Sequence, residues 1–258
     1  MSIPSIRPTN AARLMIAEQA KAARPSTINF RGRQLSYKGL PLSQEMFHDL
    51  GYHPNRFIDG ASIGLMERAV LRSFAQACGT DAEGGFYPLS ANGTNEEVLR
   101  GERDYLPAGS RNIILPVDFS QISLEHEVAH DLFISGGITV GDRLDFIKNI
   151  LAGYRGSHDP RSPHLHKDQA FFARVAEDTK GRFDLSVLST KYFGPSHWRE
   201  RDFKIFAGEC FAYACETVLH PERPMAALLP RQVFSALRYL RIFQLERIRN
   251  FQQLTGMF

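Results

Sequence analysis

Two histidines four residues apart, His126 and His130, bracket Glu127 in the segment His-Glu-Val-Ala-His. Residues four apart on a helix lie on one face, so the two imidazoles point toward one position in space. Neutral imidazole is a good zinc ligand, and zinc with an open position lowers the pKa of a bound water toward ~7. Glu127 could take the proton of that water and pass it to a leaving nitrogen. The spacing therefore predicts a Zn²⁺ site with Glu127 as general base and acid, able to hydrolyse a peptide bond.

The elements around this motif are predicted to bury it. Residues 111–119 read as a short strand, and Pro116 makes it an edge strand or stops its pairing. Ser120 is a plausible N-cap for a helix that runs to about Ser135, where two glycines end it. Apolar residues surround the polar trio at Ile122, Leu124, Val128, Leu132 and Phe133. We expect a buried helix behind an edge strand, along which a substrate could lie.

The segment resembles the zincin superfamily of metallopeptidases, whose signature is His-Glu-x-x-His. The metzincin subgroup also needs a glycine three residues after the second histidine and a third histidine three residues further on. Phe133 and Gly136 occupy these positions here, which excludes that subgroup.

A second segment, residues 208–216 (Gly-Glu-Cys-Phe-Ala-Tyr-Ala-Cys-Glu), resembles the downstream helix of the glutamate-zincins, especially that of the anthrax lethal-factor-like catalytic domain. The resemblance implies that Glu209 is the third zinc ligand. Glu209, Tyr213, Glu216 and His220 fall on one face of this helix, and buried polar groups need partners, which a metal site supplies. Where that family has an acidic residue, this chain has Tyr213, so Glu216 or Asp131 would orient the zinc histidines instead.

Several assignments stay open at this level. The other candidates for the third ligand are Glu216, Asp142 and a histidine of the loop 153–167 (His158, His164, His166). A donor to the developing oxyanion is also expected, and its candidates are Tyr213, Tyr192 and His197. We prefer Tyr213 and interpret residues 192–198 as a packed aromatic turn rather than a catalytic element.

The rest of the chain predicts an α+β fold that is predominantly helical, a zincin-like domain with a small sheet. Its single catalytic domain is expected over residues 43–258, after a flexible extension over 1–42 that contains a short helix at 11–23. Hydrophobic periodicity predicts further helices at 62–78, 144–151, 201–219 and 231–251, and residues 80–111 are expected to be mostly loop.

The composition of the chain indicates which classes of binding partner and which cellular compartment are expected. The 258 residues carry a net charge of only +3, which does not indicate a surface that binds nucleic acid. No apolar stretch approaches the ~20 residues of a membrane span. Three cysteines give no disulfide framework and indicate a reducing compartment. Residues 1–10 lack the apolar core of a cleavable secretory signal, although this polar tail could be an uncleaved export signal.

The expected activity is that of a zinc metalloendopeptidase acting on a protein or peptide as a monomer. The resemblance implies a bacterial effector or toxin, made in the bacterial cytoplasm and translocated into the cytoplasm of a host cell to cleave a host protein. One alternative is an intracellular regulatory or housekeeping zincin. Another is an inactive, zinc-stabilised binding module, although a site that needs only the metal has no use for Glu127.

Overall fold

The computed structural model describes residues 10–30, 33–77, 84–85, 111–134, 137–156, 165–179, 183–190, 193–194 and 196–257. The chain divides into two compact units that interleave along the sequence. Unit 2 contains residues 9–50 and 57–137, and unit 1 contains residues 51–56 and 138–258. Each unit therefore has its own architecture.

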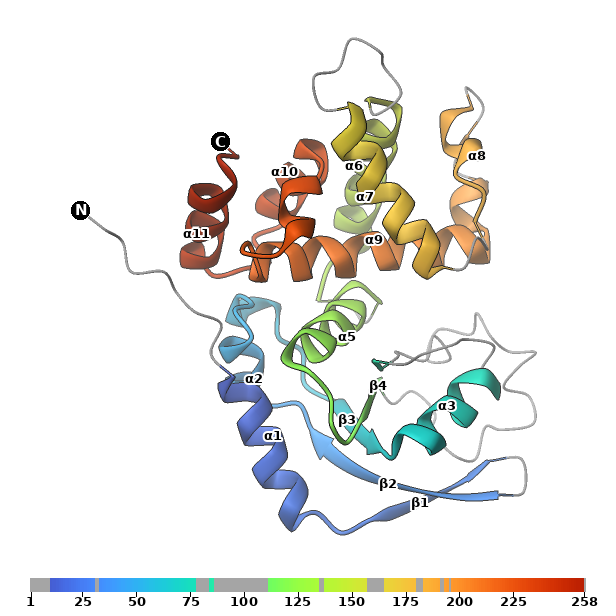
Figure 1. Ribbon diagram of the computed structural model, residues 1–258, viewed down its shortest axis with the longest axis vertical. Helices are drawn as coiled ribbons and strands as arrows, with labels where there is room; N and C mark the ends of the chain where they lie inside the picture. The colour runs from blue at the N-terminus through green and yellow to red at the C-terminus, as the bar shows by residue number, and fades with distance from the viewer. Residues whose placement is uncertain are drawn as a thin grey trace. The chain divides into compact units, whose positions relative to one another are not determined.

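A four-stranded sheet forms the framework of unit 2, in the order β1-β2-β3-β4 (Figure 1). Its strands are β1 (Ser26–Phe30), β2 (Arg33–Pro41), β3 (Ala61–Met66) and β4 (Arg111–Pro116). The first three strands pair antiparallel, whereas β4 lies parallel to β3 with Gly64 opposite Ile114. Among the described residues, β4 is therefore an edge strand.

The helices described in this unit are α1 (Ala11–Ala22), α2 (Gln44–Asp49), α3 (Arg68–Ala77) and α5 (Gln121–Ile134). Helices α3 and α5 both pack on β4, and α1 contacts β2, α2 and α5. Ile63 and Leu115 of the sheet and Leu124 and Val128 of α5 are fully shielded from solvent. Burial of these apolar side chains fixes α5 on the sheet.

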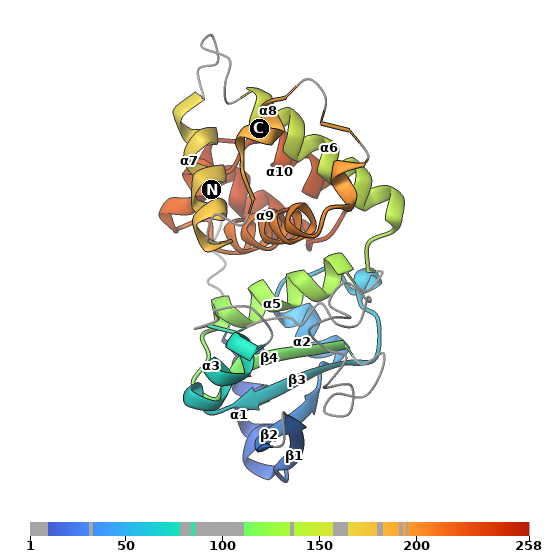
Figure 2. The same cartoon turned by 90° about the vertical axis from the view of Figure 1, so that its right-hand side faces the viewer.

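Unit 1 is helical. Its elements are η1 (Pro54–Arg56), α6 (Val140–Gly156), α7 (Leu165–Asp178), α8 (Ser186–Ser189), η3 (His197–Arg199), α9 (Arg201–Leu219), η4 (Pro224–Leu228), α10 (Arg231–Tyr239) and α11 (Leu245–Thr255). Helix α9 contacts α6, α7, α10 and α11, and is the central helix of the unit (Figure 2). Aromatic pairs fill the core, for example Phe146 with Phe211 at a centroid distance of 5.1 Å.

Residues 51–56 join unit 1 by backbone pairing. Tyr52 forms a bridge with Phe243, and their rings stack with centroids 5.7 Å apart. The backbone N–H of His53 donates to the carbonyl of Ile242 at 2.7 Å. This short segment therefore lies between two stretches of unit 2 in the sequence but belongs to the core of the other unit.

The expected boundary at residue 42 does not separate two parts of the structure, because residues 9–50 lie in one unit. Residues 11–22 form α1 and residues 26–41 contribute β1 and β2, so the extension over 1–42 is built into unit 2 from residue 11 onward. The polar composition of this stretch masked its strand pairing, which β3 completes. Residues 43–258 contribute to both compact units, and the single catalytic domain expected there stays a prediction.

Two predicted helices also need correction. Residues 61–66, assigned largely to a helix over 62–78, form the buried strand β3, and only α3 is helical. A continuous apolar run fits a buried strand as well as a helix. The helix expected over 231–251 is interrupted between α10 and α11, where Arg241 has a φ of +49°.

The predicted fold class agrees with the structure, whereas the loop expected over 80–111 lies almost entirely outside the described residues. The fold is α+β and predominantly helical, with the small sheet that was expected. Strand β4, α6 and α9 form where the sequence placed a strand and two helices, although α6 is longer than expected. Among the described helices, none is long and apolar enough to cross a membrane.

Candidate metal centre

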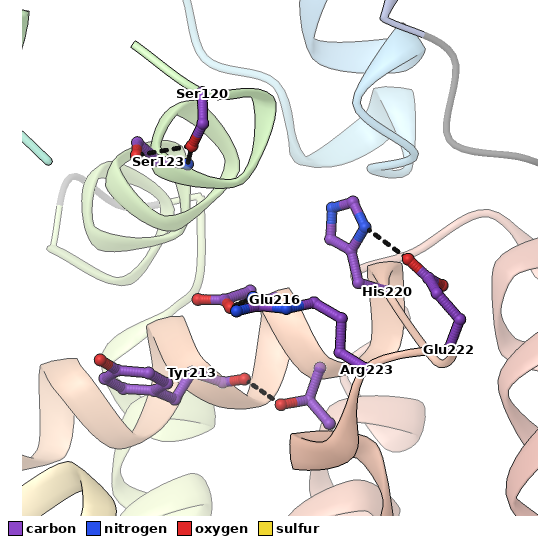
Figure 3. A network of polar contacts seen from close by, with 8 residues as sticks. Ser120, Ser123, Tyr213, Glu216, His220, Glu222 and Arg223 are labelled. Carbon is purple, nitrogen blue, oxygen red and sulfur yellow. Dashed lines mark hydrogen bonds and ion pairs between the residues drawn. The ribbon is translucent and has the colours of Figure 1, made fainter.

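Helix α5 begins as its sequence predicts. The Ser120 hydroxyl accepts a hydrogen bond from the backbone N–H of Ser123 at 3.0 Å, and the two hydroxyl oxygens lie 2.8 Å apart (Figure 3). A serine at this position satisfies one of the free N–H groups of the first turn. The following residues of α5 pack on β4 and are almost all buried, so the helix is held along its whole length.

His126 and His130 converge on the same side of α5. Their Nε2 atoms lie 3.2 Å apart, with ring centroids separated by 4.9 Å and ring planes at 70°. Two nitrogens bound at about 2.0–2.1 Å to one tetrahedral zinc are about 3.3 Å from each other. The pair therefore already has the spacing of two ligands of one metal ion. His130 is 8% exposed, whereas His126 is partly accessible.

Glu127 lies between these histidines in sequence and is 6% exposed. Beside its side chain passes the backbone of Gly85, where an added Cβ would lie 3.2 Å from the Glu127 Cγ. A carboxylate in such a confined place is restricted in its orientations, as a general base next to a metal must be.

The last turns of α5 are tied to the sheet by Asp131, which directly follows His130. Arg111 of β4 binds both carboxylate oxygens of Asp131, with its Nε 2.8 Å from Oδ1. The same guanidinium donates to the carbonyls of Ile58 and Asp59, each at 2.9 Å. Arg111 thus links the start of β4, the segment before β3 and the histidine-bearing helix.

A second polar pair is buried on α5 one turn before the histidines. The Gln121 amide donates to a carboxylate oxygen of Glu125 at 2.9 Å, and Glu125 is only 2% exposed. A buried carboxylate is costly unless it accepts hydrogen bonds. This pair supplies one such bond within the helix and does not involve the metal-ligating nitrogens.

On α9 of unit 1, Glu209, Tyr213, Glu216 and His220 follow the expected spacing along one face. Glu216 is 7% exposed and accepts a hydrogen bond from Arg223 beyond the helix (Figure 3). His220 is 4% exposed, and its Nδ1 lies 3.2 Å from a carboxylate oxygen of Glu222. Glu216 and His220 therefore each have a charged partner within unit 1.

Among the described residues, the side chains that could hold a metal ion include His126 and His130 of unit 2 and Glu209 of unit 1. Two imidazole nitrogens and one carboxylate oxygen are the ligand set of catalytic zinc sites that keep a fourth position open. The rival ligands Glu216 and Asp142 take part in ion pairs instead, with Arg223 and Arg56 respectively.

The structure describes the remaining candidates only in part. His158, His164 and Tyr192 lie outside the described residues, and His166 belongs to α7 with its side chain undescribed. The His197 ring stacks on Phe193 with centroids 5.2 Å apart, and its Nδ1 accepts a hydrogen bond from the Gly194 N–H. His197 is therefore part of a packed aromatic turn, as the sequence indicated.

The two described cysteines, Cys210 and Cys215, are fully buried on α9. Burial raises the pKa of both thiols well above the usual range, and the nearby charge of Glu209 raises the pKa of Cys210 further. Burial therefore favours the protonated form of both thiols, and neither cysteine belongs to the described side chains that could hold a metal ion.

Comparison with known proteins adds no relative. A scan against protein-family models and searches of curated proteins and of solved structures found no match to this chain.

Sequence reasoning did not single out Arg111 or Gly85, which contact Asp131 and Glu127 through the fold. Their partners lie 20 or more residues away, and no helical or strand spacing signals such pairs. Arg223 was missed for a related reason, because its interaction with Glu216 spans the turn that follows α9.

Proposed function

We propose that this protein is a zinc-dependent metalloendopeptidase of the zincin type that hydrolyses a peptide bond in a protein substrate. The observation that carries the proposal is the ligand spacing of His126 and His130, whose Nε2 atoms are 3.2 Å apart, with buried Glu127 between them. A purely structural helix has no need for two converging imidazoles and a confined carboxylate.

In this proposal, each residue has a distinct task. His126 and His130 hold the metal through Nε2, and Glu209 of α9 completes the ligand set. A zinc ion held by these residues would supply Lewis acidity toward the scissile carbonyl and the attacking water. Glu127 takes the proton from that water and returns it to the amide nitrogen that leaves. Tyr213 is proposed as the hydrogen-bond donor that stabilises the oxyanion.

The neighbouring residues keep the histidines in place. Arg111 and Asp131 hold the end of α5 on the sheet, so His130 keeps its orientation as substrate binds. Glu216 was an alternative for orienting the zinc histidines, and in this structure its carboxylate instead accepts from Arg223. We therefore assign Glu216 to the support of α9 rather than to the metal.

The experiment is the Glu127→Gln variant, studied with the wild type on a broad peptide library. Glutamine keeps the shape of the side chain but cannot accept the proton, so we expect full zinc content and a loss of cleavage of about 10²- to 10⁴-fold. Zinc is measured by elemental analysis and cleavage by mass spectrometry of the products. Equal cleavage by both proteins would refute the peptidase, and zinc bound without any cleavage by the wild type would favour a binding module.

Delivery into a host cell as a translocated effector belongs to the same proposal and rests on the resemblance alone. N-terminal proteomics of host lysate treated with the wild type and with Glu127→Gln would identify the substrate. If the cleaved proteins were those of a bacterial cytoplasm and none of a host, the intracellular regulatory protease would replace the effector.

A further inference from the structure

Two consecutive glycines, Gly84 and Gly85, lie against the helix and the strand of the candidate site. A Cβ added to Gly84 would lie 3.2 Å from the Ser123 hydroxyl oxygen, one turn before Glu127 on α5. A Cβ added to Gly85 would meet three neighbours: the Leu115 Cδ2 at 2.6 Å, the Ile114 carbonyl oxygen at 2.9 Å and the Glu127 Cγ at 3.2 Å. The dipeptide therefore passes between β4 and the Glu127 side of α5 without any side chain of its own.

The register of β4 places this contact on the edge of the strand that faces away from β3. The backbone N–H of Val117 donates to the carbonyl of Met66 in β3. Backbone groups alternate along a strand, so residue 115 also faces β3 and Ile114 faces the opposite edge. Gly85 lies next to the Ile114 carbonyl and so occupies the outer edge of β4 at the level of Glu127.

The backbone conformation at residue 85 also favours glycine. Its φ is +148°, a conformation that residues with a Cβ rarely adopt. Gly60 shares this property with a φ of +98°, yet a Cβ added there would meet nothing within 4 Å. The two glycines thus have similar backbone demands and differ in whether a side chain would reach Glu127.

We infer that Gly85 is a positioning residue for Glu127. The missing side chain leaves the space in which the stem of the glutamate lies, and any Cβ there would push the carboxylate out of line with the metal. Gly85 itself touches neither metal nor substrate. This inference rests on the proposed function, because a displaced Glu127 matters only if that residue is the base.

The test measures the affinity of the zinc-loaded protein for acetohydroxamate by calorimetry, which needs no identified substrate. A hydroxamate chelates zinc through its two oxygens and transfers its hydroxyl proton to a neighbouring carboxylate, so its affinity reports where that carboxylate lies. We expect Glu127→Gln to bind acetohydroxamate about 10- to 100-fold more weakly than the wild type, and Gly85→Ala about 3- to 10-fold more weakly, because a contact of 3.2 Å displaces the Glu127 stem by a few tenths of an ångström. Zinc content should be unchanged, and Gly60→Ala should bind like the wild type.

If Gly85→Ala does not fold, the double variant Gly85→Ala/Leu115→Val replaces it. Valine lacks the Cδ2 atom that makes the closest contact, whereas the contacts with Glu127 and Ile114 remain. Wild-type affinity in a folded Gly85 variant, with weak binding by Glu127→Gln, would overturn the positioning role and leave the proposed function intact. Equal binding by Glu127→Gln and the wild type, or no zinc in the wild type, would instead overturn the proposed function and this inference with it.

Discussion

Helices α5 and α9 carry the polar residues of the candidate site, and they are built differently. The polar groups of α5 have partners on the same helix or on β4, as in Gln121 with Glu125 and Asp131 with Arg111. The polar face of α9 draws its partners from the turn that follows the helix, where Arg223 and Glu222 lie. The first helix is tied to a sheet, and the second is capped by its own C-terminal turn.

The two ion pairs differ in their exposure to solvent. The side chains of Arg111 and Asp131 are 15% and 4% exposed, whereas those of Arg223 and Glu216 are 41% and 10% exposed. Water screens the second pair far more effectively, so its contribution to folding is smaller. The comparison teaches that the ion pair beside the α5 histidines is shielded from solvent, whereas the ion pair at the end of α9 is partly open to it.

The largest effect should distinguish the two buried histidines, one on each helix. His130→Ala removes a metal ligand, so we expect zinc affinity to fall by more than the ~10- to 100-fold cost of changing an outer partner, and cleavage to be lost. His220→Ala, equally buried but paired with Glu222, should keep the metal and most of the activity. Competition with a chromogenic chelator measures both affinities. Loss of zinc in both variants would show that the metal is held differently.

The two glutamates of α9 provide the next comparison. Glu209→Gln replaces a proposed ligand with a neutral amide, and we expect zinc affinity to fall by at least about 100-fold. Glu216→Gln keeps the shape of a residue bound to Arg223 and should reduce affinity by less than about tenfold. Both values come from the same chelator competition. The reverse order would make Glu216 the third ligand.

The sequence predicted the parts of the site that follow local periodicity. His126, Glu127 and His130 share a helix whose N-cap, Ser120, could be read directly, whereas Glu209 of α9 was assigned only through the resemblance to the glutamate-zincins. Residues four apart on a helix share one face in any fold, so this part of the prediction does not require knowledge of the tertiary structure.

What could not be predicted depends on tertiary pairing. Strands β1 and β2 are rich in polar residues, and only their pairing with β3 makes them part of a sheet. Arg111 meets Asp131 because a strand and the following helix pack together, and nothing in the composition of either segment indicates it. The apolar run of β3 was ambiguous because burial on both faces removes the alternation that identifies a strand.

Breaking each of the two ion pairs should lower the free energy of unfolding by a different amount, an effect of intermediate size among these predictions. Asp131→Asn leaves the Arg111 guanidinium without its charged partner, and breaking a buried pair this way costs about 3 kcal/mol, near the low end of the usual range because Arg111 keeps its two carbonyl acceptors. Arg223→Ala should cost about 0–1 kcal/mol, since that pair is far more exposed. Urea denaturation of the metal-free proteins measures both free energies of unfolding. Equal losses would contradict the difference in burial.

The smallest effect concerns the thiols of α9, one of which, Cys210, directly follows the proposed ligand Glu209. Burial raises the pKa of Cys210 and Cys215, so both stay protonated at neutral pH and up to the point where the raised values are reached. Since only the thiolate reacts with iodoacetamide, we expect both cysteines to be alkylated slowly in the folded protein and rapidly in urea. Peptide mapping by mass spectrometry follows each site separately, with the free amino acid as a reference for an exposed thiol.

Removing zinc with a chelator should leave the folded-state alkylation rates unchanged, because neither sulfur is a proposed ligand. Faster alkylation of Cys210 alone after zinc removal would mean that the metal protects the thiol next to Glu209. That result would bring a sulfur into the ligand set, whereas unchanged rates keep α9 as the donor of a single carboxylate.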